Sequence, residues 1–278
     1  MQSNLQTARP QYRLGIIGAG NLAGAVIRGL LHTKFCSPGD IFASQPDDAL
    51  RETLGRETGI AVTADNTEAA RSAEIILIGV KPSVVLPVVR EIAPVIEGKL
   101  AISLAAGIRL ASIEPLAAAR FMRVMTNLAA TMGEAATAFV RGPHTTADDI
   151  AQIQNIFRAI GVLVEVEENQ IDAVTALAGS GPAFVYTIIE ALADGGAREG
   201  LTNRDALTLA TQTLLGAARL VASSGQSPDE LRRMVVTPGG TTAAGLAVLE
   251  KEGASKTLSE AVCAAAARGR EMATEASA

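Results

Sequence analysis

The sequence predicts an α/β protein: an N-terminal Rossmann-type doubly wound sheet followed by an all-helical C-terminal dimerisation domain. Two observations predict it. From residue 12 to about residue 165, short apolar runs alternate with helix-length segments, as in parallel βαβ units. After that point these runs give way to alanine-rich helical patterns. We therefore expect a disordered tail over 1–11, a sheet domain over 12–165 and a helical domain over 166–278.

The apolar runs between residues 12 and 166 are expected to form strands. Most of the early runs are separated by enough chain for a crossover helix, and right-handed crossovers would make the sheet doubly wound. The expected strands are Arg13–Ile17, Ile41–Ser44, Ile75–Val80, Leu100–Leu104, Phe121–Met125, Thr137–Val140 and Val162–Val166.

A glycine turn follows the first expected strand, in the stretch LGIIGAGNLAGA at 14–25. Gly18 permits a tight turn, Gly20 lets a pyrophosphate approach the backbone, and Ala23 lets the following helix pack close to the strand. The N–H groups at the helix start then face the phosphates. The context of strand, turn and helix favours dinucleotide binding over a purely structural turn, and we assign this role to the domain over 12–165.

The end of the second strand indicates which dinucleotide is bound. A carboxylate at that point would bind the ribose 2′-hydroxyl and repel a 2′-phosphate. The sequence there is Ser44-Gln45-Pro46, with no carboxylate before Asp47. A hydroxyl and an amide can both donate to a phosphate, so the sequence favours NADP. No arginine stands at this strand tip.

Two further strand ends reach the same edge of the expected sheet. One reads Val80-Lys81-Pro82, where Lys81 is either a cofactor contact or a solvated loop lysine, and both interpretations stay open. The other is the run SLAAG at 103–107, whose small side chains leave room for a flat ring.

The helical part carries clear start signals. A helix is expected from Gly181-Pro182 to about Arg198, and a second, with Asn203 as its N-cap, to about Ser223. Capping boxes at 227–230 and 257–260 predict two more starts, the second opening the last helix. Small residues recur along these helices and allow close helix packing. We expect this part to self-associate and to form a homo-oligomer.

Two segments rich in glycine and proline precede helices: GSGP at 179–182 and TPGGTT at 237–242. Each is expected to be a loop whose backbone N–H groups and hydroxyls suit a small anion such as a substrate carboxylate. The alternative is ordinary capping with Thr241 as the N-cap. Consecutive glycines and threonines favour a site.

Composition excludes several classes of function. A net charge of −5 and an aromatic content of 3% favour neither electrostatic attraction to nucleic acid nor base stacking. Cys36 and Cys263 show no metal-ligand spacing and are expected to be buried small hydrophobes. The polar start lacks a signal sequence, and no apolar run approaches ~20 residues. We expect a cytoplasmic protein with no metal, no membrane and no nucleic-acid partner.

The helical part is poor in the usual proton donors. It has no histidine, its first lysine is Lys251, and its only tyrosine is Tyr186. Reduction of a ketone needs a donor for the developing alkoxide, usually His, Lys or Tyr. Reduction of a C=N bond fits better, because an imine can bind already protonated.

The chain resembles the pyrroline-5-carboxylate reductase family over nearly its whole length. The resemblance is carried by GAGNLA at the glycine turn, VKP at 80–82, ISLAAGI at 102–108, TALAGSGPAF at 175–184, TPGGTT at 237–242 and the succeeding GLAVLE. It implies reduction of the cyclic imine 1-pyrroline-5-carboxylate to proline with NADPH, NADH also being possible. It also implies a helical domain that interlocks with that of a partner chain.

The resemblance also implies roles for individual residues. Ser180 and the loop from Gly239 to Thr242 would hold the substrate carboxylate and imine, with Thr242 beside the imine nitrogen as the catalytic residue. The substrate-binding positions are Ser180, Gly239, Gly240, Thr241 and Thr242. The cofactor-binding positions are Gly18, Ala19, Gly20, Asn21, Leu22, Ser44, Asn66, Val80, Lys81, Pro82, Ala105 and Ala106.

Three departures leave a related cyclic imine open as the substrate. The family usually reads Arg-x-Met-Pro-Asn-Thr-Pro, whereas the stretch at 123–129 is RVMTNLA and lacks both prolines, so we expect a looser loop. Ser83 and Thr237 replace a usual Gln and Ser. A β-hydroxyacid dehydrogenase would need a lysine that residues 100–250 lack. A non-catalytic dinucleotide-binding protein would bind cofactor without turnover.

Overall fold

The computed structural model describes residues 10–275. The described chain forms two compact units, one running to Gly179 and including the chain from Ala265 onward, the other spanning Ser180–Ala264. The last strand ends at Glu165, where the change of pattern placed the domain boundary, but the first unit continues through a further helical stretch to Gly179. The first nine residues of the expected tail lie outside the described residues.

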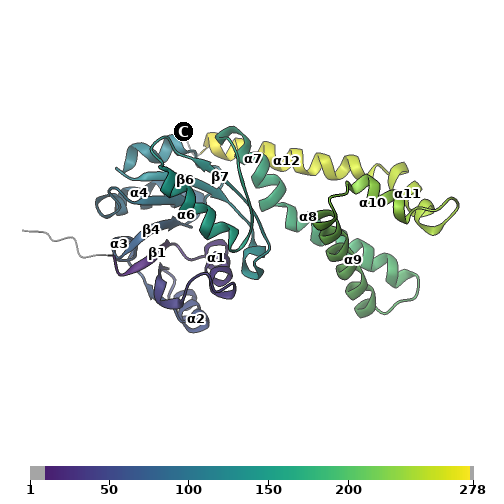
Figure 1. Ribbon diagram of the computed structural model, residues 1–278, viewed down its shortest axis with the longest axis horizontal. Coiled ribbons are helices and arrows are strands. Elements are labelled where there is room, and N and C mark those ends of the chain that lie inside the picture. The colour runs from purple at the N-terminus through teal and green to yellow at the C-terminus, as the bar shows by residue number, and fades with distance from the viewer. Residues whose placement is uncertain (1–9, 276–278) are drawn as a thin grey trace, which may run out of the picture. The chain divides into compact units, whose positions relative to one another are not determined.

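The first unit contains a sheet with helices packed around it (Figure 1). The sheet has eight strands in the order β3-β2-β1-β4-β5-β6-β7-β8. All neighbouring strands are parallel except β6 and β7, which are antiparallel. The strands are β1 (Tyr12–Ile17), β2 (Ile41–Ser44), β3 (Ala61–Thr63), β4 (Ala73–Ile78), β5 (Leu100–Ser103), β6 (Arg120–Met125), β7 (Ala135–Arg141) and β8 (Gly161–Glu165). All seven expected strands are confirmed. The short, half-buried β3 was not predicted.

Helices cover both faces of this sheet, which confirms the doubly wound fold. They are α1 (Asn21–His32), α2 (Asp48–Thr58), α3 (Asn66–Arg71), α4 (Val85–Ile92), α5 (Leu110–Ile113) and α6 (Ala147–Arg158). One hydrophobic core joins the sheet to α1 and α6, and a second joins it to α3 and α4. Successive strand residues alternate between the two cores, since Ile16 belongs to the first and Ile17 to the second.

The strand register brings the expected cofactor loops to one edge. Ile17 pairs with Ser44 on one side and Ile78 on the other, and Ile78 pairs with Ser103. These residues end their strands in one row, so the loops that follow β1, β2, β4 and β5 leave the sheet side by side. In open α/β sheets, ligands bind at this carboxyl edge.

A helical stretch leads from the sheet into the second unit. It comprises a 3₁₀ turn (Glu168–Gln170), α7 (Ile171–Val174), a π-helical turn (Thr175–Gly179) and α8 (Gly181–Arg198). The second unit continues with α9 (Asn203–Ser224), α10 (Pro228–Val235) and α11 (Thr241–Lys251), and α12 (Ala254–Glu275) returns to the first unit.

The start signals of these helices are confirmed in part. Ser227 and Glu230 form the expected capping box of α10. The N-cap of α9 is Thr202 instead of Asn203, because the Thr202 hydroxyl accepts from the amide of Asp205. The expected start at 257–260 is wrong, since α12 begins at Ala254 and includes those residues.

The second unit has almost no core of its own. Among its described residues only Ala206 and Ala210 are buried, where α9 packs on α8. Large apolar side chains stand exposed on every helix, among them Leu192, Leu209 and Met234. The helical stretch Glu168–Arg198 is long and apolar enough to cross a membrane by length and composition. Exposed apolar side chains also cover the other helices of this unit.

Candidate active site

The glycine turn after β1 has the geometry that a dinucleotide requires. Gly18 has φ +81°, and an added Cβ would lie 2.3 Å from a Val80 side-chain carbon, so only glycine fits there. Gly20 is the N-cap of α1, and open space surrounds the position of its missing Cβ. The N–H groups of Asn21, Leu22 and Ala23 begin the helix without intrahelical acceptors. This turn therefore fits a pyrophosphate at a helix N-terminus.

Ser44 and Gln45 lie at this turn, and both side chains hydrogen-bond within the protein. Ser44 is fully buried, and its hydroxyl accepts from the Gly18 amide at 3.2 Å and donates to Asn66 Oδ1 at 2.8 Å. The Gln45 amide donates to the carbonyl of Ala19 and accepts from the Asp47 amide. These hydrogen bonds shape the turn itself, and the donation of these two side chains to a phosphate stays a prediction.

A cation that sequence reasoning missed stands at this strand tip. Arg51, one turn into α2, donates from Nη1 to the carbonyl of Gln45 at 2.8 Å and pairs with Asp48 at 2.6 Å. The only hint of this contact in the sequence was an arginine six residues after Gln45, in the first turn of an expected helix. The remaining guanidinium N–H groups can serve a phosphate.

The loops after β4 and β5 complete the sheet edge. Val80 packs against Gly18, and Lys81 is exposed as the N-cap of a 3₁₀ turn that begins at Pro82. Ala105 is buried and Ala106 is half-buried. The expected cofactor-binding residues, including Asn66 and the glycine turn, therefore all lie in the first unit, along the carboxyl edge of the sheet.

A buried ion-pair network supports the Ala105 loop. Arg123 on β6 is 1% exposed, pairs with Glu168 at 2.7 Å and donates to the carbonyl of Ala105 at 3.4 Å. Arg109 pairs with Asp172 at 2.6 Å. Burial lowers the pKa of Arg123 and outweighs the opposing effect of Glu168. The network joins the loop after β5 to the start of the helical stretch.

The loop after β6 is not looser, although it lacks both prolines. Thr126 is buried, and its hydroxyl lies 2.7 Å from that of Thr137 on β7. Asn127 accepts from the Ala129 amide at 3.2 Å, a hydrogen bond that proline at 129 could not donate. Side-chain hydrogen bonds therefore fix the conformation of this loop, as the fixed φ angles of two prolines would in the family pattern.

The segment at 179–182 is not a loop, contrary to expectation. Ser180 has helical dihedral angles and lies between the π-helical turn and α8. Proline at the second position of α8 is compatible with this because the π turn displaces the preceding backbone. Ser180 is half-buried in this continuous helical stretch.

The segment at 237–242 is an uncapped helix start. Gly240 is the N-cap of α11, so the alternative with Thr241 as the N-cap is wrong. Gly239 has φ +70°, and the Gly240 amide donates to the carbonyl of Thr237. The first-turn N–H groups of α11, with the hydroxyls of Thr241 and Thr242, form a set of donors that suits a carboxylate.

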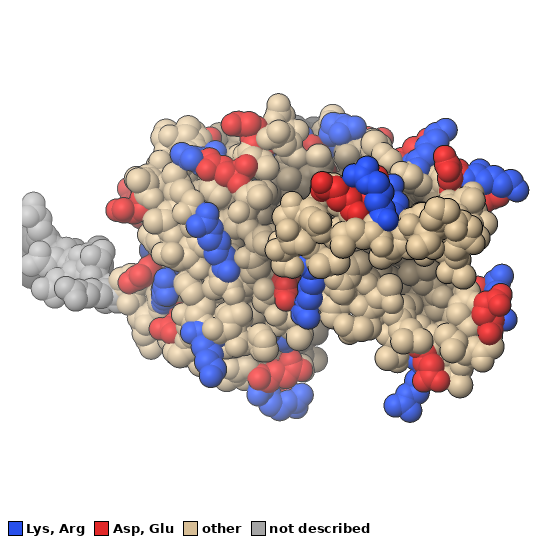
Figure 2. Space-filling model, turned by 45° about the vertical axis from the view of Figure 1, so that its right-hand side comes forward, with Lys and Arg blue, Asp and Glu red and all other residues tan. Residues whose placement is uncertain are grey.

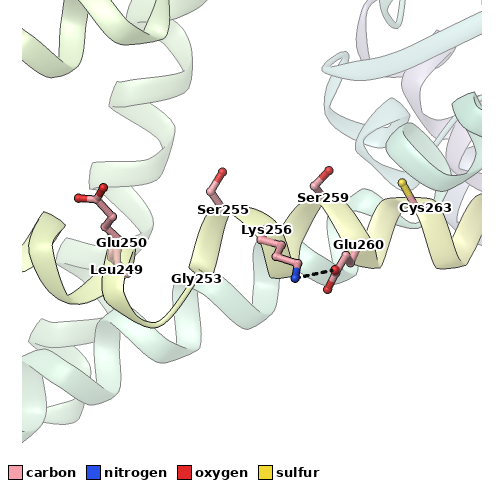
Figure 3. A pocket seen from close by; sticks show the side chains of 8 residues that line it. All are labelled: Leu249, Glu250, Gly253, Ser255, Lys256, Ser259, Glu260 and Cys263. Atoms are coloured by element: carbon pink, nitrogen blue, oxygen red, sulfur yellow. Dashed lines mark ion pairs between the residues drawn. The ribbon is translucent and has the colours of Figure 1, made fainter.

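A cavity of about 550 Å³ in the second unit contains none of the expected site residues. It lies where α11 passes into α12 (Figure 3). Ser255, Ser259 and Cys263 share one face of α12, while Lys256 pairs with Glu260 at 3.7 Å. Cys263 is exposed, and Cys36 is half-buried with its pKa raised to about 11 mainly by burial, so the expectation of two buried thiols is wrong for Cys263.

The charged surface shows no single basic area on the face drawn in Figure 2, where lysine and arginine stand beside aspartate and glutamate. Among the described residues no group of three or more His, Cys, Asp or Glu side chains could hold a metal ion.

Known protein families match both the sheet part and the helical part of the chain. Residues 13–107 match the family described as NADP oxidoreductase coenzyme F420-dependent, and residues 168–272 match pyrroline-5-carboxylate reductase dimerisation. A pyrroline-5-carboxylate reductase of Methanosarcina acetivorans is 40% identical, with 94% of this chain and 97% of that protein covered. One of Synechocystis is 41% identical, with 94% and 98% covered.

A solved structure of similar shape is that of Plasmodium falciparum pyrroline carboxylate reductase with NADP bound. It superimposes with a TM-score of 0.86 at 29% identity, covering 96% of this chain and all of that one. The fold and the glycine turn define a dinucleotide-binding oxidoreductase with a helical second part. The identity over nearly the whole length then shows that the chain belongs to the pyrroline-5-carboxylate reductase family.

Proposed function

We propose that this protein reduces the C=N bond of 1-pyrroline-5-carboxylate with NADPH, giving L-proline and NADP⁺, the last step of proline biosynthesis. The observation that carries the proposal is the identity of about 40%, over 94% of the chain, with proteins of that name. The uncapped start of α11 supports it, because the substrate is a small carboxylate.

The cofactor would lie at the carboxyl edge of the sheet. The N–H groups at the start of α1 would bind the pyrophosphate, and the open space at Gly20 would admit it. Ala105 and Ala106 leave space for the nicotinamide ring. The cofactor supplies a hydride to the imine carbon, and one proton ends on the ring nitrogen, which balances the reaction.

NADPH is preferred over NADH in this proposal, although NADH can also be used. No carboxylate occupies the end of β2, and Arg51 brings a positive charge to it. The guanidinium would bind the 2′-phosphate with the N–H groups that Gln45 and Asp48 do not use.

The substrate would be held in the second unit by Ser180 and by Gly239, Gly240, Thr241 and Thr242. The amides at the start of α11 would bind the carboxylate. The Thr242 hydroxyl would hold the proton on the imine nitrogen, as the catalytic residue. This arrangement needs no strong acid, because the imine binds protonated.

Self-association completes the proposed enzyme. A helical unit with two buried residues gains its core from a second copy, and the match to a dimerisation family supports a homodimer or a larger assembly of dimers. We propose a cytoplasmic enzyme that does not act on nucleic acid or at a membrane.

An NADPH oxidation assay tests the proposed function. The purified protein is offered 1-pyrroline-5-carboxylate beside six-membered and sulfur-containing cyclic imines at matched concentrations. We expect the highest kcat/KM with 1-pyrroline-5-carboxylate and proline as the product. Faster turnover of another imine would assign that imine instead, and cofactor binding without any turnover would remove the enzymatic proposal.

A further inference from the structure

In the helical stretch between residues 171 and 198, the backbone carbonyl of Ala178 lacks its usual helical hydrogen-bond donor. In an α-helix, the carbonyl of Ala178 would accept from the amide of residue 182. Residue 182 is proline and has no N–H, and its ring also crowds the carbonyl four positions earlier. The π-helical turn over Thr175–Gly179 lies directly before this position. Ala178 is buried, so water cannot easily replace the missing donor.

Asn127, in the loop that follows β6, supplies the donor. Its side-chain amide donates to the carbonyl oxygen of Ala178 at 3.1 Å, and both residues are buried within the first unit. The orientation of the amide group is set by its other end, where Oδ1 accepts from the Ala129 amide at 3.2 Å. The nitrogen must then face Ala178.

The position of Asn127 gives this bond a consequence for the site. Asn127 follows β6 at the carboxyl edge of the sheet, one strand beyond the loop that ends β5. Ala178 precedes Ser180, an expected substrate residue, by two positions. The bond therefore anchors the backbone just before Ser180 to the edge that carries the cofactor loops.

We propose that Asn127 is a positioning residue for substrate binding, and that it acts by satisfying the Ala178 carbonyl that Pro182 leaves without a donor. The proposal rests on the proposed function, because it takes Ser180 to bind the substrate. Ala129 contributes to the same arrangement, because its backbone amide donates to Asn127 Oδ1. A proline there, as in the family pattern, would lack the N–H that orients the Asn127 side chain.

The decisive variant is Asn127→Ser. Serine keeps a short oxygen that can accept from the Ala129 amide, so the turn after β6 stays capped, but it is too short to reach Ala178. We expect the KM for 1-pyrroline-5-carboxylate to rise roughly tenfold, as for loss of one buried hydrogen bond. The Kd of NADPH should change less than twofold. Met132→Ala, at an exposed position of the same 3₁₀ segment, is the matched control and should leave both constants unchanged.

A second pair of variants tests the route through the carbonyl. Pro182→Ala restores an N–H at 182, so that the Ala178 carbonyl gains a donor within the helix. We compare the fold increase in KM that Asn127→Ser causes in the Pro182→Ala background with the one it causes in wild type. The increase in the Pro182→Ala background should be less than half as large. An equal effect in both backgrounds would overturn the proposed route. A lower melting temperature with an unchanged KM would reduce Asn127 to a structural role and also overturn it.

Hydrogen exchange separates this proposal from the proposed function. Faster exchange of the amides between residues 175 and 187 in Asn127→Ser, and not in Met132→Ala, would show the anchoring whichever imine is the substrate. If wild type fails to turn over 1-pyrroline-5-carboxylate, the proposed function fails while this readout stands. Unchanged exchange together with normal wild-type turnover would contradict the anchoring alone.

Discussion

The hydroxyl of Ser44 accepts a hydrogen bond from the amide of Gly18 at 3.2 Å, across the edge of the sheet where β1 and β2 end. The same hydroxyl donates to Asn66, so its hydrogen bonds are used within the protein. We therefore expect recognition of a 2′-phosphate at this strand tip to depend on Arg51, where cofactor preference can be tested without disturbing the glycine turn.

Replacing Arg51 with glutamine should raise the KM for NADPH about fivefold to tenfold, because a charge-assisted hydrogen bond to the 2′-phosphate is lost. The KM for NADH, which has no such phosphate, should change less than twofold. Steady-state kinetics with both cofactors measures this. Arg56→Gln, at an exposed position of the same helix, removes the same charge and serves as the control. An equal loss for both cofactors would contradict the role of Arg51.

Thr242→Ala should lower kcat/KM about 10- to 150-fold, which corresponds to ~1.5–3 kcal/mol for a hydrogen bond to a charged group in the transition state. Thr242→Ser should keep most of the activity, since it keeps the hydroxyl. Because Gly240 is the N-cap, neither change should lower the melting temperature by more than a few degrees. Wild-type kcat/KM in the alanine variant would remove Thr242 from the mechanism.

Thr126→Pro should destabilise the protein by about 1–3 kcal/mol, because the buried hydroxyl of Thr137 loses its partner. A gain in cofactor affinity from a stiffer loop is not expected, since side-chain hydrogen bonds already fix the loop. Urea unfolding monitored by circular dichroism measures the difference. Thr126→Ser retains the hydroxyl and should cost less than half as much. An unchanged unfolding midpoint in the proline variant would show that the hydroxyl pair contributes nothing.

Asp149 should give the stability of the sheet unit a dependence on acid pH. Burial acts to raise the pKa of this carboxyl, but hydrogen bonds from Arg120 and Thr146 outweigh it and the pKa is lowered. A depressed pKa in the folded state stabilises the fold above the unfolded value of about 3.9, and the stabilisation is lost as pH falls through the folded pKa. Asp149→Asn should therefore cost roughly 3 kcal/mol at pH 7 and progressively less below pH 4.

Melting temperatures of wild type and Asp149→Asn between pH 3 and pH 7 measure this effect. Asp48→Asn, whose carboxylate is 83% exposed, is the control and should follow wild type at every pH. A difference between wild type and Asp149→Asn that stays constant down to pH 3 would contradict the assignment.

The smallest active species should contain two chains. The exposed apolar side chains of the second unit predict that dilution lowers specific activity when dimers dissociate. Light scattering combined with an activity assay over a dilution series measures both quantities. Flotation with lipid vesicles separates self-association from membrane binding, and we expect the protein to remain unbound. An active monomer at assay concentration would contradict the dimer.

The strands and the glycine turn could be predicted because their causes are local. The strands follow from short apolar runs, the turn from a glycine that adopts positive φ at residue 18, and the start of α10 from a serine three residues before Glu230; each signal involves only a few neighbouring residues. The three-residue β3 could not be recognised, because so short a segment carries no period.

The parts that sequence reasoning missed depend on how the folded chain turns and packs. Arg51 reaches the carbonyl of Gln45, six positions earlier, across the turn that joins β2 to α2. Asn127 meets Ala178 across 51 positions of the chain. Sequence alone determined which residues lack partners, such as the carbonyl before Pro182 and the amides at uncapped helix starts. Tertiary structure decided which of these receive a partner from elsewhere in the protein, because hydrogen bonds require atoms within about 3 Å and only the packed sheet brings them there.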